Sequence, residues 1–286
     1  MRSREPRECS WNIDGLTLRG LEWGSPGERP VLALHGWQDN AASFLRLAPQ
    51  LSGHHVVAPD LSGQGRSDFR SLDATYQIWD DLPQLAGLRD ALGWDRCALL
   101  GHSRGAIMST LMSAAQPERV DSVVLLDAIV PPAVADSAFP VQLGAFLRDR
   151  NTAGAASPRR YASRAEAVAA RARRGLPEAA AKALAGRGLA GDDERGWEWR
   201  IDPRLRGASA VKMSDGQIRA LLGAISAPVL LLQAVRGMMQ SHPLDDMVRS
   251  HVRDLRVEAV PGDHHFHMEA VIDEWVPTIL SFMEQS

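Results

Sequence analysis

The sequence predicts an α/β fold with a mostly parallel central sheet, helices on both faces of that sheet and a helical cap inserted into the core. Short apolar runs rich in Val, Leu and Ala alternate with longer segments of helical periodicity, which is typical of βαβ units around a buried sheet. Residues 131–214 break this alternation with a long stretch of helical propensity. One apolar run leads directly into a Gly-x-Ser-x-Gly sequence and then a helical pattern, which is the context of a strand-to-helix turn.

The central sheet is predicted from one hairpin and six apolar runs. The segments 10–14 and 16–23 flank Gly15 and indicate an antiparallel hairpin at one edge of the sheet. The remaining strands are expected at residues 31–34, 56–58, 98–100, 123–126, 229–232 and 257–260. The sheet should therefore be parallel everywhere except at that edge.

Helical periodicity predicts the elements that cover the sheet. Helices are expected at residues 42–51, 78–92, 104–116 and 269–283. Pro277 should interrupt the last of them. Right-handed crossovers between parallel strands should distribute the helices over both faces.

The cap is predicted from residues 131–214, which are rich in Ala and Arg and punctuated by Pro and Gly. The chain then divides into a core of residues 1–130 and 215–286 and a helical cap of residues 131–214. Glu166 and Glu178 interleave with a cluster of arginines in this segment, and aromatic residues do not alternate with them as a base-stacking surface would require, so we interpret the cluster as a solvated helix face. Its arginines are Arg159, Arg160, Arg164, Arg171, Arg173 and Arg174.

Composition and charge narrow the classes of function. The 286 residues are 45% hydrophobic and 23% charged, which is ordinary for a folded globular chain. The formal net charge of -3 gives no overall field that favours nucleic acid or a membrane surface, so we expect neither partner. The first nine residues carry charges where a secretory signal needs an apolar segment, and the two cysteines lie far apart, so we expect a cytoplasmic protein. Nothing in the sequence indicates an oligomeric state.

The strongest functional signal is the run Gly101-His102-Ser103-Arg104-Gly105, which stands between an apolar run and a helical pattern. In that context the backbone turns sharply at the serine, and the glycines avoid clashes with the neighbouring strand and helix. The hydroxyl of Ser103 is then expected at the carboxyl edge of the sheet, beside the positive end of the following helix. We therefore predict a catalytic nucleophile here rather than a serine in an ordinary glycine-rich turn.

A second glycine turn follows the first parallel strand and reads Leu34-His35-Gly36-Trp37. A sharp turn at Gly36 can direct the backbone N–H of Trp37 toward the space above the serine. Together with the backbone N–H of Arg104 it would form an oxyanion hole, in which each donor contributes roughly 3 kcal/mol of transition-state stabilisation.

Five motifs together resemble a known family. They are HGWQDNAASF from His35, APDLSGQGRS from Ala58, YQIWDDLPQL from Tyr76, LGHSRGA from Leu100 and WEWRIDPRL from Trp197. Over nearly the whole chain they resemble the serine hydrolase-like branch of the α/β-hydrolase family, which implies an α/β-hydrolase fold and a Ser-His-acid hydrolase. Gln64 stands where relatives usually have His. Arg104 stands where Met or Gln is commoner, so a cation is expected near the pocket mouth.

The catalytic base is expected near the C-terminus, because the order of the triad on this fold is Ser, acid, His. The segment VPGDHHFHME from residue 260 is the one that qualifies. Relatives usually show Gly-His followed five residues later by an acidic residue, and His264 has that distance to Glu269. We choose His264, with His265 as the alternative. The histidines here would also suit a metal, but no further ligand motif accompanies them and we predict none.

The acid of the triad is displaced from its usual place. In most relatives it follows the strand predicted at 229–232, but the turn QAVRGM in this chain contains no carboxylate. One strand earlier, the segment RVDSVVLLDAIVPP resembles α/β-hydrolases, including a subset of haloalkane dehalogenases, that take their acid from this strand end. We predict that Asp127 fixes the tautomer of His264 and stabilises its imidazolium. A carboxylate that merely caps the turn is the alternative role, and Asp245 and Asp246 are the fallback acids.

Aromatic and methionine side chains near the expected junction of cap and core are candidates for the substrate pocket. They are Trp37, Phe139, Trp197, Trp199 and Met238. No GxGxxG or GxxxxGK[ST] sequence accompanies them, so no cofactor is expected.

These features together predict a carboxylesterase-like serine hydrolase that cleaves a carboxylic ester of a small molecule through an acyl-enzyme. C–C bond hydrolysis, lactonase or acyltransferase chemistry on the same serine stays open. So does a non-catalytic binding or interaction protein with this fold.

Overall fold

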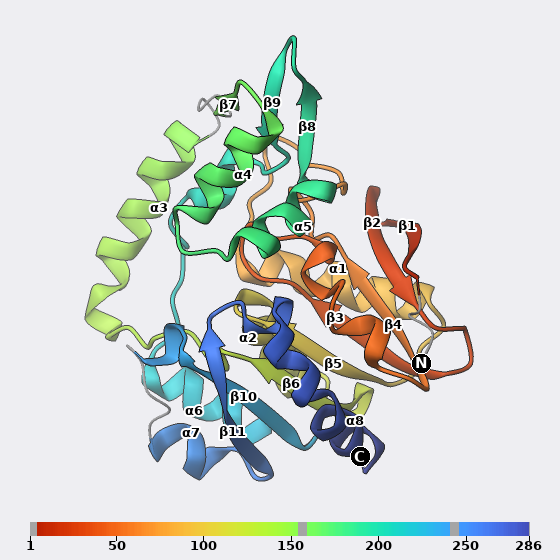
Figure 1. Ribbon diagram of the computed structural model, residues 1–286. Helices are drawn as coiled ribbons and strands as arrows, with labels where there is room; N and C mark the ends of the chain where they lie inside the picture. The colour runs from red at the N-terminus through yellow and green to blue at the C-terminus, as the bar shows by residue number, and fades with distance from the viewer. Residues whose placement is uncertain (1–4, 154–158, 241–245, 286) are drawn as a thin grey trace.

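The computed structural model describes residues 5–153, 159–240 and 246–285, and its centre is one eight-stranded sheet (Figure 1). In their order across the sheet, the strands are β1 (Arg7–Ile13), β2 (Leu16–Trp23), β4 (His54–Pro59), β3 (Arg29–Leu34), β5 (Cys97–His102), β6 (Val120–Leu126), β10 (Val229–Arg236) and β11 (Leu255–Asp263). β1 pairs antiparallel with β2, and β2 with β4, whereas the other neighbouring pairs are parallel. The predicted sheet, mostly parallel with a hairpin at one edge, is confirmed.

Helices cover both faces of the sheet, as predicted. One face carries α1 (Ile78–Ala91), α2 (Arg104–Ala115), α6 (Asp215–Ala224) and α7 (Asp246–His251), and the other carries α8 (Val276–Glu284). Successive residues of a strand point to opposite faces, so Leu99 joins the first apolar cluster and Leu100 the second. No helix in the described part of the chain combines the length and apolar character that a membrane span needs.

The prediction of a helix at residues 42–51 is wrong. The segment forms two 3-10 turns, Ala41–Phe44 and Ala48–Gln50, separated by a bend. The side chain of Asn40 accepts a hydrogen bond from the Ala42 N–H at 3.0 Å and starts the first turn. Pro49 cannot donate the backbone hydrogen bond that a continuous helix requires, so apolar periodicity misled the prediction.

The last helix also differs from the prediction. Residues Ala270–Glu274 form a 3-10 turn, and α8 begins only afterwards. Pro277 lies in the first turn of α8. Backbone N–H groups in the first turn have no acceptor within the helix, so the missing N–H of proline costs no hydrogen bond there. The proline therefore starts this helix instead of interrupting it.

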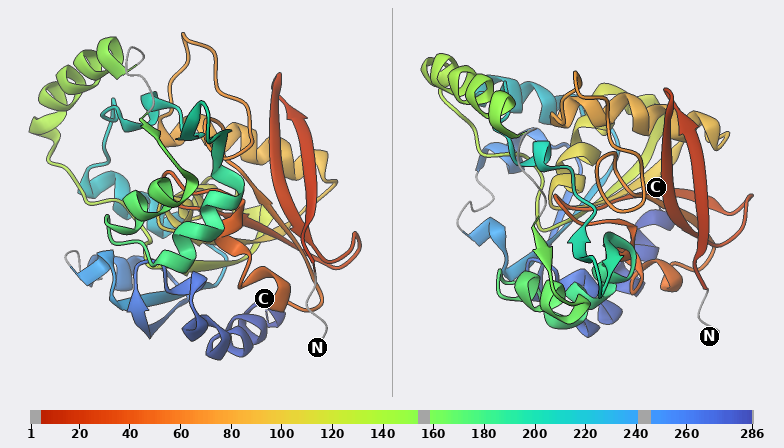
Figure 2. Two further views of the ribbon diagram at one scale, coloured as in Figure 1. Left: turned by 45° about the horizontal axis from the view of Figure 1, so that its top comes forward. Right: turned by 90° about the horizontal axis from the view of Figure 1, so that it is seen from above.

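Residues 131–214 lie between β6 and α6 and contain both helices and strands. The helices are α3 (Phe139–Ala153), α4 (Arg164–Ala172) and α5 (Glu178–Gly188), and the strands β7 (Arg160–Tyr161), β8 (Leu189–Asp192) and β9 (Gly196–Trp199) form a small antiparallel sheet. We keep the name cap for this segment, in which the small sheet was not predicted. Helix α3 lies at the opposite side of the molecule from the β1–β2 hairpin (Figures 1 and 2).

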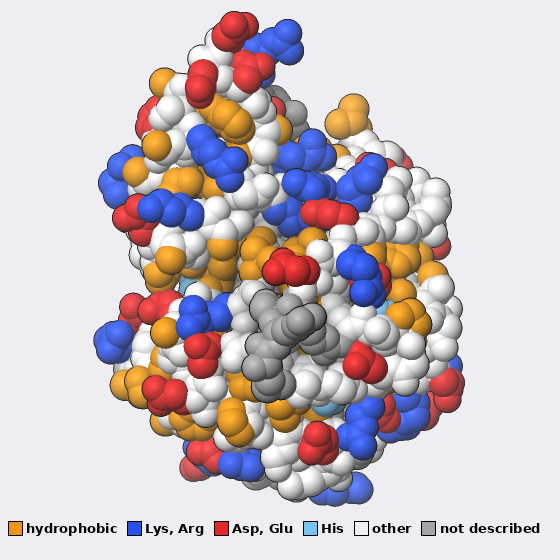
Figure 3. Space-filling model, turned by 45° about the vertical axis from the view of Figure 1, so that its right-hand side comes forward, with side chains coloured by type: hydrophobic (Ala, Val, Ile, Leu, Met, Phe, Trp, Pro, Cys, Tyr) orange, Lys and Arg blue, Asp and Glu red, His pale blue; other side chains and the backbone are white. Residues whose placement is uncertain are grey.

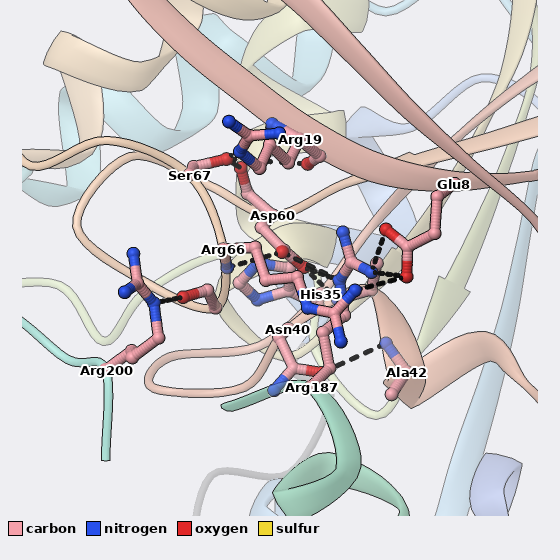
Figure 4. Close-up of polar contacts among 12 residues, drawn as sticks. Glu8, Arg19, His35, Asn40, Ala42, Asp60, Arg66, Ser67, Arg187 and Arg200 are labelled. Carbon is pink, nitrogen blue, oxygen red and sulfur yellow. Dashed lines mark hydrogen bonds and ion pairs between the residues drawn. The ribbon is translucent and has the colours of Figure 1, made fainter. Parts of the chain in front are cut away.

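A buried ion pair joins the cap to the core. Arg187 at the end of α5 donates from Nε to Asp60 Oδ2 at 2.7 Å, and its guanidinium also reaches Glu8 of β1 at 2.6 Å (Figure 4). Asp60 is fully buried at the end of β4, and it also accepts backbone N–H groups of Ala41 and Arg66, each at 2.7 Å. The contact fixes α5 above the turn that follows β3.

Candidate active site

Ser103 occupies a strained turn between β5 and α2. Its backbone has φ 54° and ψ −118°, a left-handed conformation that side-chain-bearing residues rarely adopt. A hydrogen bond of 3.1 Å from its N–H to the carbonyl of Leu126 ties the turn to β6. A Cβ atom at Gly105 would lie 1.9 Å from the Leu34 carbonyl oxygen, so only glycine allows α2 to approach β3 this closely. The geometry is that of a serine presented at the carboxyl edge of the sheet, and the residue is partly exposed.

The chain brings His264 and Asp127 together across the sheet edge. Nδ1 of His264 lies 2.6 Å from Oδ2 of Asp127, which is fully buried directly after β6. Because an ionised carboxylate can only accept, this bond places the ring proton on Nδ1 and leaves Nε2 with a lone pair. Asp127 also has a positive φ of 53°, so both Ser103 and its candidate acid occupy strained positions after neighbouring strands.

The end of β10 and the turn that follows it hold the Asp127 carboxylate with backbone N–H groups. The N–H of Ala234 donates to Oδ1 at 3.0 Å and the N–H of Met238 donates to Oδ2 at 2.8 Å. This is the turn in which the sequence shows no carboxylate, and it supplies two amide donors to an acid from the neighbouring strand. Sequence reasoning missed these donors, because backbone amides leave no trace in residue identities.

The hydroxyl of Ser103 and the ring of His264 do not share a hydrogen bond within the described residues. Ser103 lines a cavity of about 530 Å³, His264 lines a second cavity of about 440 Å³, and Met238 lines both. Hydrogen bonds between catalytic groups are often long before substrate binds, so the arrangement remains compatible with proton transfer.

The turn after β3 lies directly beside the serine. A Cβ atom at Gly36 would be 3.2 Å from the Cβ of Ser103. In the described structure, the backbone N–H groups of Trp37 and Arg104 donate to no protein acceptor, so both are free to bind a substrate oxygen. Gln38, the next residue, has a φ of 63° and is held by the 2.6 Å bond from its N–H to the side chain of Gln64.

The Gln64 contact explains one departure from the family pattern. Gln64 is buried and supplies an oxygen acceptor to the strained turn that carries the Trp37 N–H. The sequence drew attention to Gln64 as an unusual residue type. It gave no sign that the Gln64 side chain accepts a hydrogen bond from Gln38, which lies 26 positions away.

The guanidinium of Arg104, which the sequence led us to expect near the pocket mouth, is paired with a carboxylate of the core. It donates to Oδ2 of Asp81 at 2.7 Å and to the Tyr76 carbonyl at 3.3 Å. Asp81 is buried and also pairs with Arg70 at 3.0 Å. Asp81 is therefore shared between two arginines, and the guanidinium of Arg104 is held by an ion pair with a carboxylate of the core.

His265 faces a different carboxylate from His264. Its Nε2 lies 3.3 Å from Asp39 Oδ2, and Nδ1 of the buried His102 lies 3.7 Å from the same oxygen. Burial opposes ionisation of Asp39, yet the hydrogen bond from His265 and the charge of Arg171 outweigh it and hold the pKa of Asp39 well below its usual range. The geometry therefore favours His264 over His265 as the partner of the candidate acid.

Asp39, His102 and His265 are also the described residues that could hold a metal ion, since their ligand atoms all lie within 4.8 Å of one another. Arg171 donates to the other oxygen of Asp39 at 2.8 Å and already supplies a positive charge there. A divalent cation would have to bind against that guanidinium, so we assign no metal to this cluster.

The five candidate pocket residues separate into two groups. Trp37, Trp199 and Met238 line the cavity that His264 also lines. Phe139 lines another cavity, and Trp197 lines none of the described ones because its indole N–H bonds Asp193 within the cap. The assignment of Phe139 and Trp197 to the substrate pocket stays a prediction.

Of the two fallback acids, Asp246 begins α7, where an acidic residue stabilises the helix N-terminus. Asp245 lies outside the described residues.

Comparison with known proteins identifies the fold family. The model of the alpha/beta hydrolase fold family matches residues 29–177, more than half of the chain. A serine hydrolase-like protein of Danio rerio is 31% identical over 88% of this chain and 80% of its own length, and one from Dictyostelium discoideum is 28% identical over 94% and 79%. The crystal structure of a hypothetical protein from Pseudomonas aeruginosa PAO1 has a TM-score of 0.91 and 33% identity, covering 97% of this chain and 99% of that one. The chain thus belongs to the α/β hydrolase fold family, with serine hydrolase-like relatives over most of its length.

Proposed function

We propose that this protein is a serine hydrolase that cleaves a carboxylic ester bond, with Ser103 as nucleophile, His264 as base and Asp127 as the acid that orients the base. The observation that carries the proposal is the 2.6 Å bond between His264 Nδ1 and the buried carboxylate of Asp127. A bond of this kind fixes the tautomer in which Nε2 can take the proton of a serine hydroxyl.

The reaction proceeds in two steps. In the first, Nε2 of His264 takes the proton from Ser103 Oγ as the oxygen attacks the carbonyl carbon, and then gives that proton to the leaving alcohol as the ester C–O bond breaks. In the second, His264 takes a proton from water, which attacks the acyl-enzyme, and returns it to Ser103 Oγ as the carboxylic acid leaves. Asp127 keeps its charge throughout and stabilises the imidazolium.

The oxyanion of each tetrahedral intermediate binds the backbone N–H groups of Trp37 and Arg104. Both donors lie on turns that flank Ser103, and both lack a protein acceptor within the described structure. Donors that need no rearrangement typically contribute about 3 kcal/mol each to transition-state stabilisation.

The cavity beside Ser103 supports an apolar acyl group. Its volume is about 530 Å³, and its walls include Ile107, Ile129, Ile218, Met238 and Met247. A cavity of this size and lining accommodates a medium-length acyl chain.

A fluorophosphonate probe and a series of p-nitrophenyl esters of increasing acyl length test the proposal. We expect labelling of the wild type and of a Ser250→Ala control, no labelling of Ser103→Ala, and ester hydrolysis that is lost in Ser103→Ala and His264→Ala. Labelling without turnover of any ester would favour C–C hydrolase, lactonase or acyltransferase chemistry on the same serine. Absence of both would leave a non-catalytic binding protein.

A further inference from the structure

The second cavity, of about 440 Å³, differs sharply from the apolar one beside Ser103. It lies between cap and core and is lined by four arginines and one carboxylate, which are Arg159, Arg171, Arg174, Arg206 and Asp39. It also contains His264, together with the aromatic rings of Trp37 and Trp199. All four arginines belong to the cap, and three of them, Arg159, Arg171 and Arg174, belong to the arginine cluster that the sequence suggested was a solvated helix face.

The positive charge of this cavity is not balanced by its own acids. Asp39 is paired with Arg171, whose guanidinium also stacks 4.7 Å from the ring centre of Trp199. In the described part of the chain, Arg174 and Arg206 form no ion pair, and Arg159 instead lies 5.0 Å from the ring centre of Tyr161. On the face shown in Figure 3, by contrast, blue and red side chains are intermixed.

The apolar cavity has the opposite character. Its described lining contains no lysine or arginine, and its charged members are the carboxylates Asp127 and Asp215. An anionic acyl group would be repelled there, whereas an anion in the second cavity would meet an excess of guanidinium groups. Met238 lines both cavities and marks where they adjoin.

The proposed chemistry assigns a direction to a substrate that spans both cavities. Ser103 faces the apolar cavity and forms the acyl-enzyme, so the acyl chain belongs on that side. His264 lines the arginine-bearing cavity and must protonate the leaving oxygen, so the leaving group belongs on that side.

We infer that the substrate is an ester with an apolar acyl chain and a leaving group that carries an anion, either a carboxylate or a phosphate. The anion binds Arg174 and Arg206 at the cap, with Arg171 already positioned beside Asp39. This inference rests on the proposed serine hydrolase function and names the substrate class of the same site.

Three matched substrates test the inference. All release a nitrophenol: p-nitrophenyl hexanoate is neutral, the hexanoyl ester of a hydroxynitrobenzoate carries the anion on the leaving group, and the mono-p-nitrophenyl ester of adipic acid carries it on the acyl side. We expect kcat/KM for the hydroxynitrobenzoate ester to exceed that of the neutral ester by about tenfold at low salt, mainly through KM, and the advantage to shrink as salt screens the arginines. The adipate ester should be the poorest substrate. A hexanoyl ester of nitrocatechol phosphate distinguishes a phosphate site from a carboxylate site.

The variants are compared by one ratio, kcat/KM for the ester with the anionic leaving group divided by kcat/KM for the neutral ester. Arg174→Gln and Arg206→Gln should each lower that ratio by about two- to fivefold, and the double variant should bring it near one. Arg173→Gln, an exposed neighbour that lines none of the described cavities, is the matched control and should keep the wild-type ratio.

Two outcomes overturn the inference and leave the proposed function intact: equal kcat/KM for the charged and neutral leaving groups, or a preference for the adipate ester. An advantage that survives the double variant would also refute the arginine site. If Ser103 is not labelled and no ester is hydrolysed, the proposed function fails and the inference fails with it.

Discussion

Gly237 lies so close to Asp127 that a Cβ atom at residue 237 would be 2.1 Å from Oδ2 of the carboxylate. The same oxygen accepts the N–H of Met238 at 2.8 Å and bonds the ring of His264 at 2.6 Å. The missing side chain at residue 237 therefore makes room for the contact that orients the candidate base.

Gly237→Ala should displace the Asp127 carboxylate and with it the His264 ring. We expect kcat for p-nitrophenyl esters to fall by about tenfold or more, because small misplacements of catalytic groups have large effects on rate. Gly223→Ala is the control, since a Cβ atom there meets nothing within 4 Å in α6 and should leave kcat unchanged. Equal activity of the two variants would show that this close approach does not matter for catalysis.

Asp127→Asn should preserve the fold and lower kcat by a factor on the order of 10³ to 10⁴, because an amide no longer fixes the required tautomer of His264. Asp246→Asn should leave kcat at the wild-type level. Steady-state hydrolysis of the best p-nitrophenyl ester measures both. Undiminished activity of Asp127→Asn would remove this carboxylate from the mechanism.

Gln64→Leu removes the acceptor for the Gln38 N–H and should loosen the turn that carries the Trp37 donor. We expect kcat to fall by about tenfold with little change in KM, since the oxyanion contact forms mainly in the transition state. Gln64→His, the residue that relatives usually carry, should recover much of the activity by supplying a ring nitrogen as acceptor. If both variants behave alike, the hydrogen bond is not what this position contributes.

Arg187→Met leaves the buried Asp60 carboxylate without its ion partner and should lower the free energy of unfolding by about 3–5 kcal/mol. Lys182→Met is the control. It breaks an exposed ion pair with Glu178 on the same helix and should change the free energy of unfolding by less than about 0.5 kcal/mol. Urea unfolding measures both values. Combining Arg187→Met with Asp60→Asn should cost less than the sum of the single changes, and strict additivity would argue against the ion pair.

Acidification should destabilise the fold below pH 6.5. Burial lowers the pKa of His102 and the pKa of His267 well below the ordinary value of 6.5, so the unfolded chain binds protons in this range that the folded chain does not. The stability that these neutral rings contribute is present above pH 6.5 and is lost as the pH falls. Each contributes a slope of up to about 1.4 kcal/mol per pH unit.

His267→Gln should flatten that dependence, as measured by urea unfolding between pH 7.5 and 5.5. Ser43→Ala is the matched control, because it removes the 2.8 Å hydrogen bond to the His267 ring and leaves the titrating group in place. It should lower stability at every pH without changing the slope. An unchanged slope in His267→Gln would contradict the role of this histidine.

The sheet and the turn that carries Ser103 could be predicted because their determinants are local. Apolar runs bounded by glycine turns specify buried parallel strands, and Gly101 and Gly105 flank the serine within five residues. The pairing of Asp127 with His264 was predictable only as a position at a strand end, since the contact spans 137 residues.

The elements that were mispredicted contain local breaks that helical periodicity and residue type do not show. The 42–51 segment has helical periodicity, yet Pro49 and the capping side chain of Asn40 divide it into two short turns. The hairpin of β8 and β9 interrupts a segment of high helix propensity, where a turn with positive φ at Gly191 and Gly196 outweighs the pattern of the neighbouring residues. Aromatic residue type likewise placed Trp197 in the pocket, although its bond to Asp193 keeps it in the cap.

The amides that hold Asp127 have a consequence for how this turn can diverge among homologues. Every amino acid except proline offers a backbone N–H, so the hydrogen bonds that Ala234 and Met238 donate to the Asp127 carboxylate do not depend on their side chains. A segment that contributes only backbone N–H groups can change its amino-acid sequence without losing these hydrogen bonds. Gly237 should resist such changes, because any side chain there would meet the Asp127 carboxylate.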